Sequence, residues 1–354
     1  NEFHGTVYGS YRDKDMVRSR LEGDRTDFNG FKDEKTYGMT FGGPIVKDKL
    51  FFFTNYEKYE RSGGGVSLSE SPYNKDPAKG GISDADISAT TNVTLNAGDD
   101  VDVATTTTAG QTISIAAGGD VNANVLTATN AAIDIDADGD IALAGTATAG
   151  TTIDAVADLS VTTAAVTAGG AITLDGGTDA TLDGAATGAS IAITAGDLLT
   201  QAGAIDVTGD IDLESTTGAV VTTGTVEGAN YAVDAADSIA INGDIDLTGA
   251  FTLGQSRQPT GTATINADIV NTTSVTADTD GDILITAGSD LNSTGAVDID
   301  AGNLLDVDGQ INGTDIVLNA DGDALIATAL IADGRVGITA DNDVLTEGAI
   351  TATT

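Results

Sequence analysis

From about residue 92 onward the chain repeats itself every 19 to 20 residues, and this period constrains the fold more than any other feature. Each repeat opens with two apolar residues separated by a single position. The pairs are Val93/Leu95, Ile113/Ile115, Ile133/Ile135, Ile172/Leu174, Ile191/Ile193, Ile211/Leu213, Tyr231/Val233, Phe251/Leu253, Val297/Ile299, Ile316/Leu318 and Val336/Ile338. A repeat of this length predicts a solenoid.

A second short apolar segment follows the first by about eight residues, for example Ile141/Leu143 after Ile133/Ile135. The two-residue alternation indicates strands. Between the segments lies a turn of Gly, Asp and Asn, residue types that tolerate a sharp corner. We therefore predict an all-β fold. It is a right-handed parallel β-helix in which each coil has a strand, a corner, a second strand and a return of small residues, stacked at about 4.8 Å.

Charge and aromatic content divide the chain into two unlike parts. Residues 1–79 carry 13 Lys/Arg against 13 Asp/Glu, whereas residues 80–354 carry 2 against 41. Of the 15 aromatic residues, 13 precede residue 80. We predict barrel-like strands in 1–61, a linker rich in Gly, Ser and Asp in 62–90, and a β-helix in 91–354 with about thirteen coils and a length of roughly 60 Å. The chain begins mid-strand and stops partway through a coil, so we expect it to be a fragment.

Composition excludes several classes of protein. The chain has no cysteine, which rules out disulfides and cysteine zinc sites. A formal net charge of −39 repels the phosphates of DNA and RNA, so no nucleic-acid partner is expected. The sequence contains no apolar run long enough for a transmembrane helix.

Three segments in the first eighty residues alternate and are rich in aromatic side chains: 3–11, 35–43 and 50–59. Strands of about ten residues with aromatics near their ends are typical of outer-membrane β-barrels, although three strands cannot close a barrel. The stretch from Gly42 to Phe53, GGPIVKDKLFFF, closely resembles the first barrel strands of TonB-dependent outer-membrane receptors.

This resemblance implies an orientation in the membrane. The turn at residues 47–49 would be periplasmic, residues 20–34 would form the first external loop, and the segment from Ser62 would begin the second. The β-helix would then emerge outside the cell. The plug, the energy-coupling box and the remaining strands of that family are missing, so we do not expect this polypeptide to transport a substrate alone.

The repeat half resembles the stalks of filamentous-haemagglutinin and autotransporter-passenger exoproteins in its period and composition, which implies a surface filament or adhesin. The register is interrupted between Phe251 and Val297, where residues 255–261 contain Arg257 and Pro259. We expect a protruding loop there. It is either a tolerated insertion or a recognition site.

Regularly spaced aspartates raise the possibility of bound metal. Equivalent carboxylates of neighbouring coils would repel by about 1 kcal/mol in water. Solvent screening, raised pKa values or bound cations would relieve that repulsion. Calcium suits a wall of such oxygens, and it is the one cofactor the sequence suggests. The alternative is that they are solvated turn residues, since the calcium-binding nonapeptide and the EF-hand pattern are missing. The candidates are Asp100, Asp120, Asp140, Asp134, Asp136, Asp138, Asp278, Asp280 and Asp282.

Catalysis is not expected. Pectate lyases and polygalacturonases use the β-helix, but here carboxylates occur throughout, so no pair is distinguished as an acid and a base. The repeat has too few cations and aromatics to bind an acidic sugar: Arg257, Arg335, Tyr231 and Phe251. The single histidine, His4, lies in the barrel-like part, and no His or Lys in the repeat could activate a serine or threonine.

These observations predict a non-catalytic, adhesin-like stalk or filament at the surface of a Gram-negative-type cell. The expected partners are glycans of a host, a neighbouring cell or a matrix, or further copies of the chain in filaments. The N-terminal part would contact the outer membrane. The alternative is a fragment of a TonB-dependent receptor whose external loop carries the β-helix as an accessory domain. A reading frame that continues into aromatic strands favours the receptor, and one that continues into more coils favours the adhesin.

Overall fold

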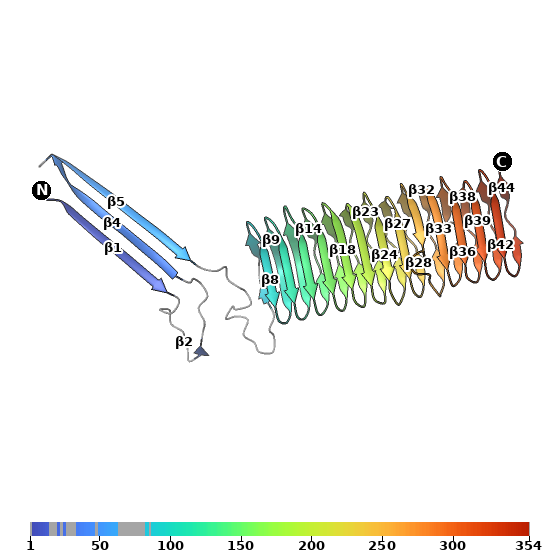
Figure 1. The fold of residues 1–354 in the computed structure, drawn as a ribbon, viewed down its shortest axis with the longest axis horizontal. Coiled ribbons are helices and arrows are strands. Elements are labelled where there is room, and N and C mark those ends of the chain that lie inside the picture. The colour runs from blue at the N-terminus through green and yellow to red at the C-terminus, as the bar shows by residue number, and fades with distance from the viewer. Residues whose placement is uncertain are drawn as a thin grey trace. The chain divides into compact units, whose positions relative to one another are not determined.

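The computed structural model describes residues 2–13, 20–21, 24–25, 33–46, 49–62, 82–84 and 86–353. They form two compact units, Asn1–Gly80 and Gly81–Thr354 (Figure 1). All the regular structure in the described residues is β-strand, which confirms the predicted fold class. None of the described residues belongs to a helix that could cross a membrane.

The first unit contains an antiparallel sheet in the order β1 (His4–Asp13), β4 (Asp33–Val46), β5 (Leu50–Ser62). A tight turn joins the last two strands, and in it the Lys49 backbone N–H donates to the Val46 carbonyl at 3.0 Å. Two short strands, β2 (Arg20–Leu21) and β3 (Asp24–Arg25), pair with each other inside the predicted first external loop. The rest of that loop and most of the predicted linker, 63–81, lie outside the described residues.

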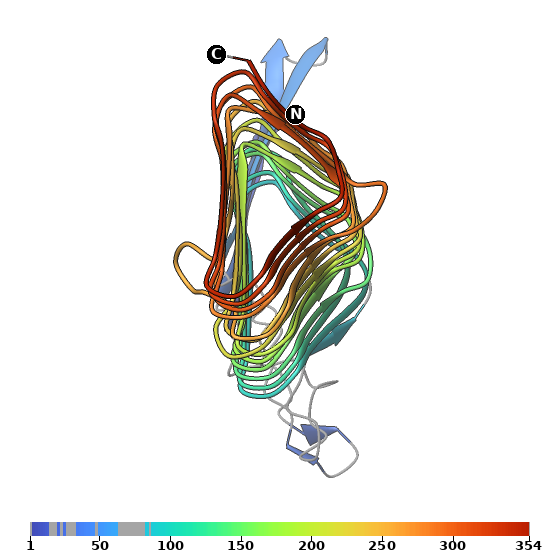
Figure 2. The same cartoon turned by 90° about the vertical axis from the view of Figure 1, so that its right-hand side faces the viewer.

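The second unit is a parallel solenoid whose coils each contribute a strand to three stacks (Figure 2). The first stack is a 13-stranded sheet made from the apolar pairs that define the repeat. Its strands are β8 (Val93–Ala97), β10 (Ile113–Ala117), β12 (Ile133–Ala137), β15 (Ile153–Ala157), β18 (Ala171–Gly176), β21 (Ser190–Ala195), β24 (Ile211–Ser215), β27 (Tyr231–Ala235), β30 (Ala250–Leu253), β33 (Ser274–Thr279), β36 (Val297–Ala301), β39 (Ile316–Ala320) and β42 (Val336–Ala340).

The second stack follows the first around a Gly/Asp corner. It contains β6 (Ile82–Asp84), β9 (Val101–Ala109), β11 (Val121–Ala128), β13 (Ile141–Leu143), β16 (Val161–Thr163), β19 (Ala180–Leu182), β22 (Leu199–Gln201), β25 (Val220–Thr222), β28 (Ile239–Ile241), β31 (Ala263–Ile265), β34 (Ile283–Ile285), β37 (Leu305–Val307), β40 (Ala324–Ile326) and β43 (Val344–Thr346).

The third stack forms where only a return of small residues was expected. It begins with β7 (Ile87–Ala89) and the second halves of β9 and β11. It continues with β14 (Ala147–Ala149), β17 (Val166–Ala168), β20 (Ala186–Gly188), β23 (Ile205–Val207), β26 (Val226–Gly228), β29 (Ile245–Leu247), β32 (Ile269–Thr272), β35 (Asp290–Ser293), β38 (Gln310–Gly313), β41 (Leu330–Ala332) and β44 (Ile350–Ala352). Some members turn only small residues inward, such as Ala147 and Ala149 of β14, so their sequence resembles a spacer.

The alternation of each strand places its apolar residues inside the coil. In β12, Ile133, Ile135 and Ala137 are 0, 2 and 1 % exposed, while the residues between them face solvent. Stacked in register, these side chains form one apolar column that no single coil could bury. The two aromatic residues of the solenoid, Tyr231 and Phe251, lie in this column in adjacent coils, with ring centroids 5.7 Å apart.

The start of the solenoid and the coil between Phe251 and Val297 differ from the sequence-based expectation. Strands β6 and β7 pair with β9, so the solenoid includes residues before 91. The apparent gap between Phe251 and Val297 is filled by Val275, which pairs with both. The second inward residue of this strand is Ala277. Because alanine is small, the pair Val275/Ala277 does not stand out in the sequence as a member of the repeat.

Candidate functional sites: the acidic face of the solenoid and the aromatic sheet

Carboxylates recur in two rows among the outward side chains of the first stack, interrupted by Thr, Ala and Val, and this side is here called the acidic face. Residues paired between coils lie one above the other, close to the 4.8 Å strand spacing. One row contains Asp134, Asp154, Asp212 and Asp298, and the other contains Asp136, Asp175, Glu214, Asp234, Asp278 and Asp300. At the N-terminal end of this face, Ser114, Asp134, Asp136, Asp154 and Val156 line a shallow, open depression.

Crowding on the acidic face perturbs three carboxyl groups. Partial burial raises the pKa of Asp154, and the charges of Asp134 and Asp175 raise it further. The pKa of Asp300 is raised by partial burial and then by the charges of Asp278, Asp321 and Asp298. Asp154 and Asp300 are therefore each repelled by their neighbouring carboxylates more strongly in the native state than in the unfolded chain.

The pKa of Asp212 is raised in the same way, first by partial burial and then by the charges of Asp234 and Glu214. The perturbed groups therefore recur along the face, and the repulsion is a property of the stacked rows.

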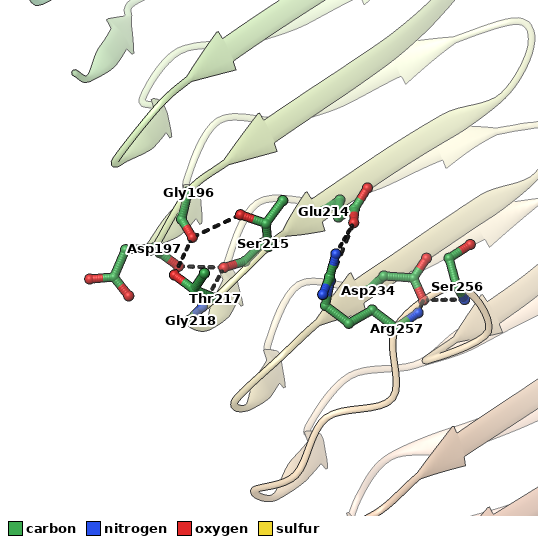
Figure 3. Close-up of polar contacts among 10 residues, drawn as sticks. Gly196, Asp197, Glu214, Ser215, Thr217, Gly218, Asp234, Ser256 and Arg257 are labelled. Carbon is green, nitrogen blue, oxygen red and sulfur yellow. Dashed lines mark hydrogen bonds and ion pairs between the residues drawn. The ribbon is translucent and has the colours of Figure 1, made fainter. Parts of the chain in front are cut away.

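A loop crosses the acidic face and supplies a cation to it. Strand β30 ends at Leu253, and the chain leaves the coil at the next residue, Gly254, whose φ of +72° belongs to the left-handed region. The Arg257 guanidinium lies 3.2 Å from Glu214, which belongs to a coil two turns earlier (Figure 3). The backbone N–H groups of Ser256 and Arg257 donate to Asp234 Oδ1 at 3.0 and 3.2 Å.

The loop is the protrusion expected from the sequence, and it is visible as the golden-yellow excursion from the coils in Figure 2. Gln258 Nε2 also donates to Asp278 Oδ2 at 2.5 Å. The loop thus contacts three acidic residues of one row, Glu214, Asp234 and Asp278. Asp234 is 4 % exposed, and the two loop N–H groups satisfy this otherwise costly buried carboxylate.

A different set of aspartates lies at the corners and binds the backbone of the next coil. Asp100 Oδ1 accepts from the Asp120 N–H and Asp120 Oδ1 accepts from the Asp140 N–H, each at 2.9 Å. The series continues from Asp140 Oδ1 to the Ser160 N–H at 3.0 Å. Each aspartate directly precedes a strand of the second stack. The sequence alone suggested solvent screening, raised pKa values or bound cations as the means of relieving repulsion between these carboxylates. In the structure, each of them instead accepts a hydrogen bond from a backbone N–H group.

The same arrangement occurs at the other corners. Before the third stack, Asp244 Oδ1 accepts from the Asp268 N–H at 3.1 Å, and Asp268 Oδ1 from the Asp290 N–H at 2.9 Å. Before the first stack, Asn230 Oδ1 accepts from the Ala250 N–H at 2.8 Å. These side-chain bonds connect consecutive coils at positions where the backbone turns a corner. The sequence signal was the recurrence of Asp or Asn immediately before a strand.

The structure separates the nine proposed calcium ligands. Asp100, Asp120 and Asp140 bind backbone N–H groups, and Asp282 Oδ1 accepts from Asn303 Nδ2 and the Leu304 N–H. Asp138 and Asp280 lie at corners, and Asp134, Asp136 and Asp278 lie on the acidic face. Among the described residues, no three acidic or histidine side chains gather closely enough to hold a metal ion. Calcium binding remains a prediction.

The sheet of the first unit has two chemically different faces. One, here called the apolar face, carries Val7 opposite Met39 and Met39 opposite Tyr56. Phe3, Phe41 and Phe52 form an aromatic cluster on the same face, with centroid distances of 5.5 to 6.3 Å. Most of these side chains are exposed, including Val7 at 86 %.

The opposite face is polar in its middle, although Phe51 and Phe53, which are 58 and 73 % exposed, lie on it near the turn. Tyr8 lies over Gly38 of the neighbouring strand, and its hydroxyl donates to Glu57 Oε2 at 2.5 Å. A Cβ on Gly38 would lie 2.5 Å from that hydroxyl, so the position requires glycine. Thr6, Thr40 and Asn55 occupy the next positions across the three strands. Strands that are apolar on one side and polar on the other have the pattern of an outer-membrane barrel wall.

Residues 1–166 match the family model of an outer membrane beta barrel domain, a range that covers less than half of the 354-residue chain. No curated protein and no solved structure matches the chain. The matched range contains the antiparallel sheet and also the first coils of the solenoid. Those coils are parallel, and what they share with barrel strands is the two-residue alternation.

The corner bonds predict a stability effect at Asp120. Replacing Asp120 by Ala removes the acceptor of the Asp140 N–H, and we expect the free energy of unfolding to fall by about 1 kcal/mol. Asp120→Asn keeps the acceptor oxygen and should retain most of that stability. Asp136→Ala, on the acidic face one coil away, is the control. Urea unfolding of the three variants measures the difference, and equal losses for Asp120→Ala and Asp120→Asn would contradict the role of the hydrogen bond.

The acidic face predicts that moderate acidification stabilises the solenoid. The pKa values of Asp154, Asp212 and Asp300 are raised above the ordinary 3.8, so the native state binds protons more readily than the unfolded chain. The free energy of unfolding should rise as the pH falls from 7 through the raised values toward 3.8. Thermal melting across this range measures the change.

Asp300→Asn removes one of these charges and should raise the melting temperature at pH 7. Because Asp300 is exposed, screening by solvent limits the gain to less than about 1 kcal/mol. Asp333→Asn, at an exposed corner, serves as the control. A melting temperature that only declines on acidification, with no gain from Asp300→Asn, would contradict repulsion on this face.

The ion pair between the loop and the acidic face predicts that Arg257 contributes to the free energy of unfolding, and that salt weakens this contribution. Arg257→Gln breaks the ion pair with Glu214 and should lower stability by roughly 0.5 kcal/mol at low ionic strength. In about 1 M salt the difference from wild type should vanish. Arg335→Gln is the matched control, since Arg335 is 85 % exposed and lies 3.8 Å from Asp315. An equal effect of the two substitutions at low salt would contradict a specific role for the loop.

Proposed function

We propose that the chain is a non-catalytic element of a bacterial outer membrane, with the first unit in the membrane wall and the solenoid outside the cell. The solenoid serves as an extended, adhesin-like stalk. Its surface partners are glycans of a neighbouring cell, host or matrix, or further copies of the chain. Calcium at the candidate aspartates belongs to the same proposal.

The observation that carries the proposal is the two-faced sheet within the range that matches the outer-membrane family model. From Tyr37 to Gly43, the position opposite Phe52, the apolar face extends for about 20 Å at 3.3 to 3.4 Å per residue, which is comparable with the roughly 25 Å apolar band of an outer-membrane barrel. The polar face with Tyr8 and Glu57 would line the interior. Such a sheet does not close a barrel alone, so further strands must complete the wall.

The form of the second unit supports a structural role. Its apolar residues fill a continuous core, and Thr and Asp recur along its outer surface. A rod of this kind holds a distant surface away from the membrane, and net negative charge keeps it soluble.

A second candidate is a TonB-dependent receptor whose external loop carries the solenoid as an accessory domain. The observation that favours it is the continuity of the family match, which passes through the boundary at Gly80 into the coils. The GGPIVKDKLFFF stretch supports the same assignment, since the structure places it at the tight turn between β4 and β5. A full reading frame that returns to aromatic strands after the coils would identify the receptor.

Surface labelling tests the proposed arrangement directly, because the natural chain has no cysteine. Thr187→Cys places a thiol on the exposed side of the third stack, and Lys49→Cys places one in the turn between β4 and β5. On intact cells a membrane-impermeant maleimide should label Cys at 187 and not at 49. Both positions should react after the outer membrane is permeabilised. Labelling of position 49 alone on intact cells, or of neither position before permeabilisation, would overturn the arrangement.

A further inference from the structure

Five threonines lie one above the other on the outward side of the third stack, in consecutive coils near the N-terminal end of the solenoid. The strand register pairs each of them with the next without interruption: Thr108, Thr127, Thr148, Thr167 and Thr187. At a strand spacing of about 4.8 Å, this row is about 19 Å long. The five residues are here called the threonine row.

The surface around the threonine row carries no charge. The third-stack segments of these coils and the corners on either side of them contain only uncharged residues: 104–112, 124–132, 144–152, 164–170 and 184–189. The row ends where the next three coils place Asp206, Glu227 and Asp246 at the same outward position. The solenoid therefore presents a neutral surface in a part of the chain, residues 80–354, that contains 41 acidic residues.

The hydroxyl groups of the threonine row are free to bind a ligand. Within the part of the chain that the structure describes, none of the five hydroxyls hydrogen-bonds to another protein group. At a neighbouring corner, by contrast, Asn130 Nδ2 donates to the Gly110 carbonyl at 2.8 Å. A Cβ on Gly150 would lie 2.6 Å from the Thr129 carbonyl, so that corner requires glycine and no side chain extends from it beside Thr148. The row thus presents regularly spaced hydroxyl and methyl groups to solvent.

We propose that the threonine row and the neutral surface around it bind ice. A threonine hydroxyl donates one hydrogen bond and accepts two, so it can take the place of a water molecule at the surface of the ice lattice. The methyl groups between the hydroxyls are apolar and restrict the orientation of the adjacent water layer. The strand spacing is close to the repeat of water molecules along one axis of ice, so successive hydroxyls can meet successive lattice positions.

Charge and the burial of the aromatic residues favour ice over a sugar or an ionic ligand. An ionised carboxylate held against ice would lose hydration at a large cost, so a surface that binds ice must be neutral, as this one is. Sugar rings pack against exposed aromatic side chains in many binding sites, and both aromatic residues of the solenoid, Tyr231 and Phe251, are buried. The inference concerns the solenoid alone and does not rest on the proposed membrane location of the first unit.

Uptake of the full chain into growing ice tests the proposal. Residues 80–354 contain no lysine, so an amine-reactive dye labels only residues before 80 and leaves the threonine row unmodified. The labelled protein is kept in detergent while ice grows slowly from the solution on a cold surface. The double variant Thr148→Asp/Thr167→Asp places charge in the row. It should fold, because Asp206 occupies the same position in a later coil.

The matched control is Thr162→Asp/Thr181→Asp, which adds the same charge to an outward row of the second stack that already contains Asp102. We expect the wild type and the control to enter the ice and the double variant to stay in the liquid, with melting temperatures confirming that all three proteins fold. Exclusion of the wild type from ice, or equal uptake of the wild type and the double variant, would overturn the proposal. An equal loss of uptake in the control would overturn it as well, because added charge anywhere on the solenoid would then account for the effect.

Discussion

Hydrogen bonding between successive coils is the constraint on which the solenoid depends. Each strand donates to and accepts from the strands above and below it, so every backbone group of a coil is satisfied only if the next coil repeats its path. The corners break this pattern, because the chain changes direction there and some N–H groups lose a carbonyl partner. Aspartate and asparagine side chains at Asp100, Asp120, Asp140 and Asn230 fill those places. Much of the acidity of the chain is therefore a structural consequence of turning corners in a stack.

Stacking has a second electrostatic consequence on the flat outer side of the first sheet. When the coil repeats, a carboxylate on one strand becomes partly buried and acquires charged neighbours. Partial burial first, and then the charges of these neighbours, raise the pKa values of Asp154, Asp212 and Asp300. The chain relieves this locally where the Arg257 loop folds back over Glu214 and Asp234. The insertion that lengthens one coil thus also supplies a cation to the row.

The sequence predicted the architecture because its strongest signal, the Ile/Val/Leu pair, is also the strongest physical constraint. The third stack was missed because its inward residues are uneven: Ala147 and Ala149 bury little apolar surface, whereas Ile205 and Val207 form a stronger pair. Val275 was missed beside the small Ala277. The corner role of Asp120 depends on a donor twenty residues away, which only the register reveals. Likewise, alternation predicted the aromatic strands of the first unit, whereas the pairing of Met39 with Tyr56 follows from the position of the turn between β4 and β5.

The direction of the hydrogen bonds in the solenoid determines how it responds to mechanical force. The bonds between coils run along the axis of the stack, so tension applied along that axis loads one coil at a time. A coil that detaches converts a rise of about 4.8 Å into about 20 residues of extended chain, or roughly 65 Å. A solenoid built in this way can lengthen in steps while its remaining coils stay folded, and each released turn rewinds on the template of the one below it.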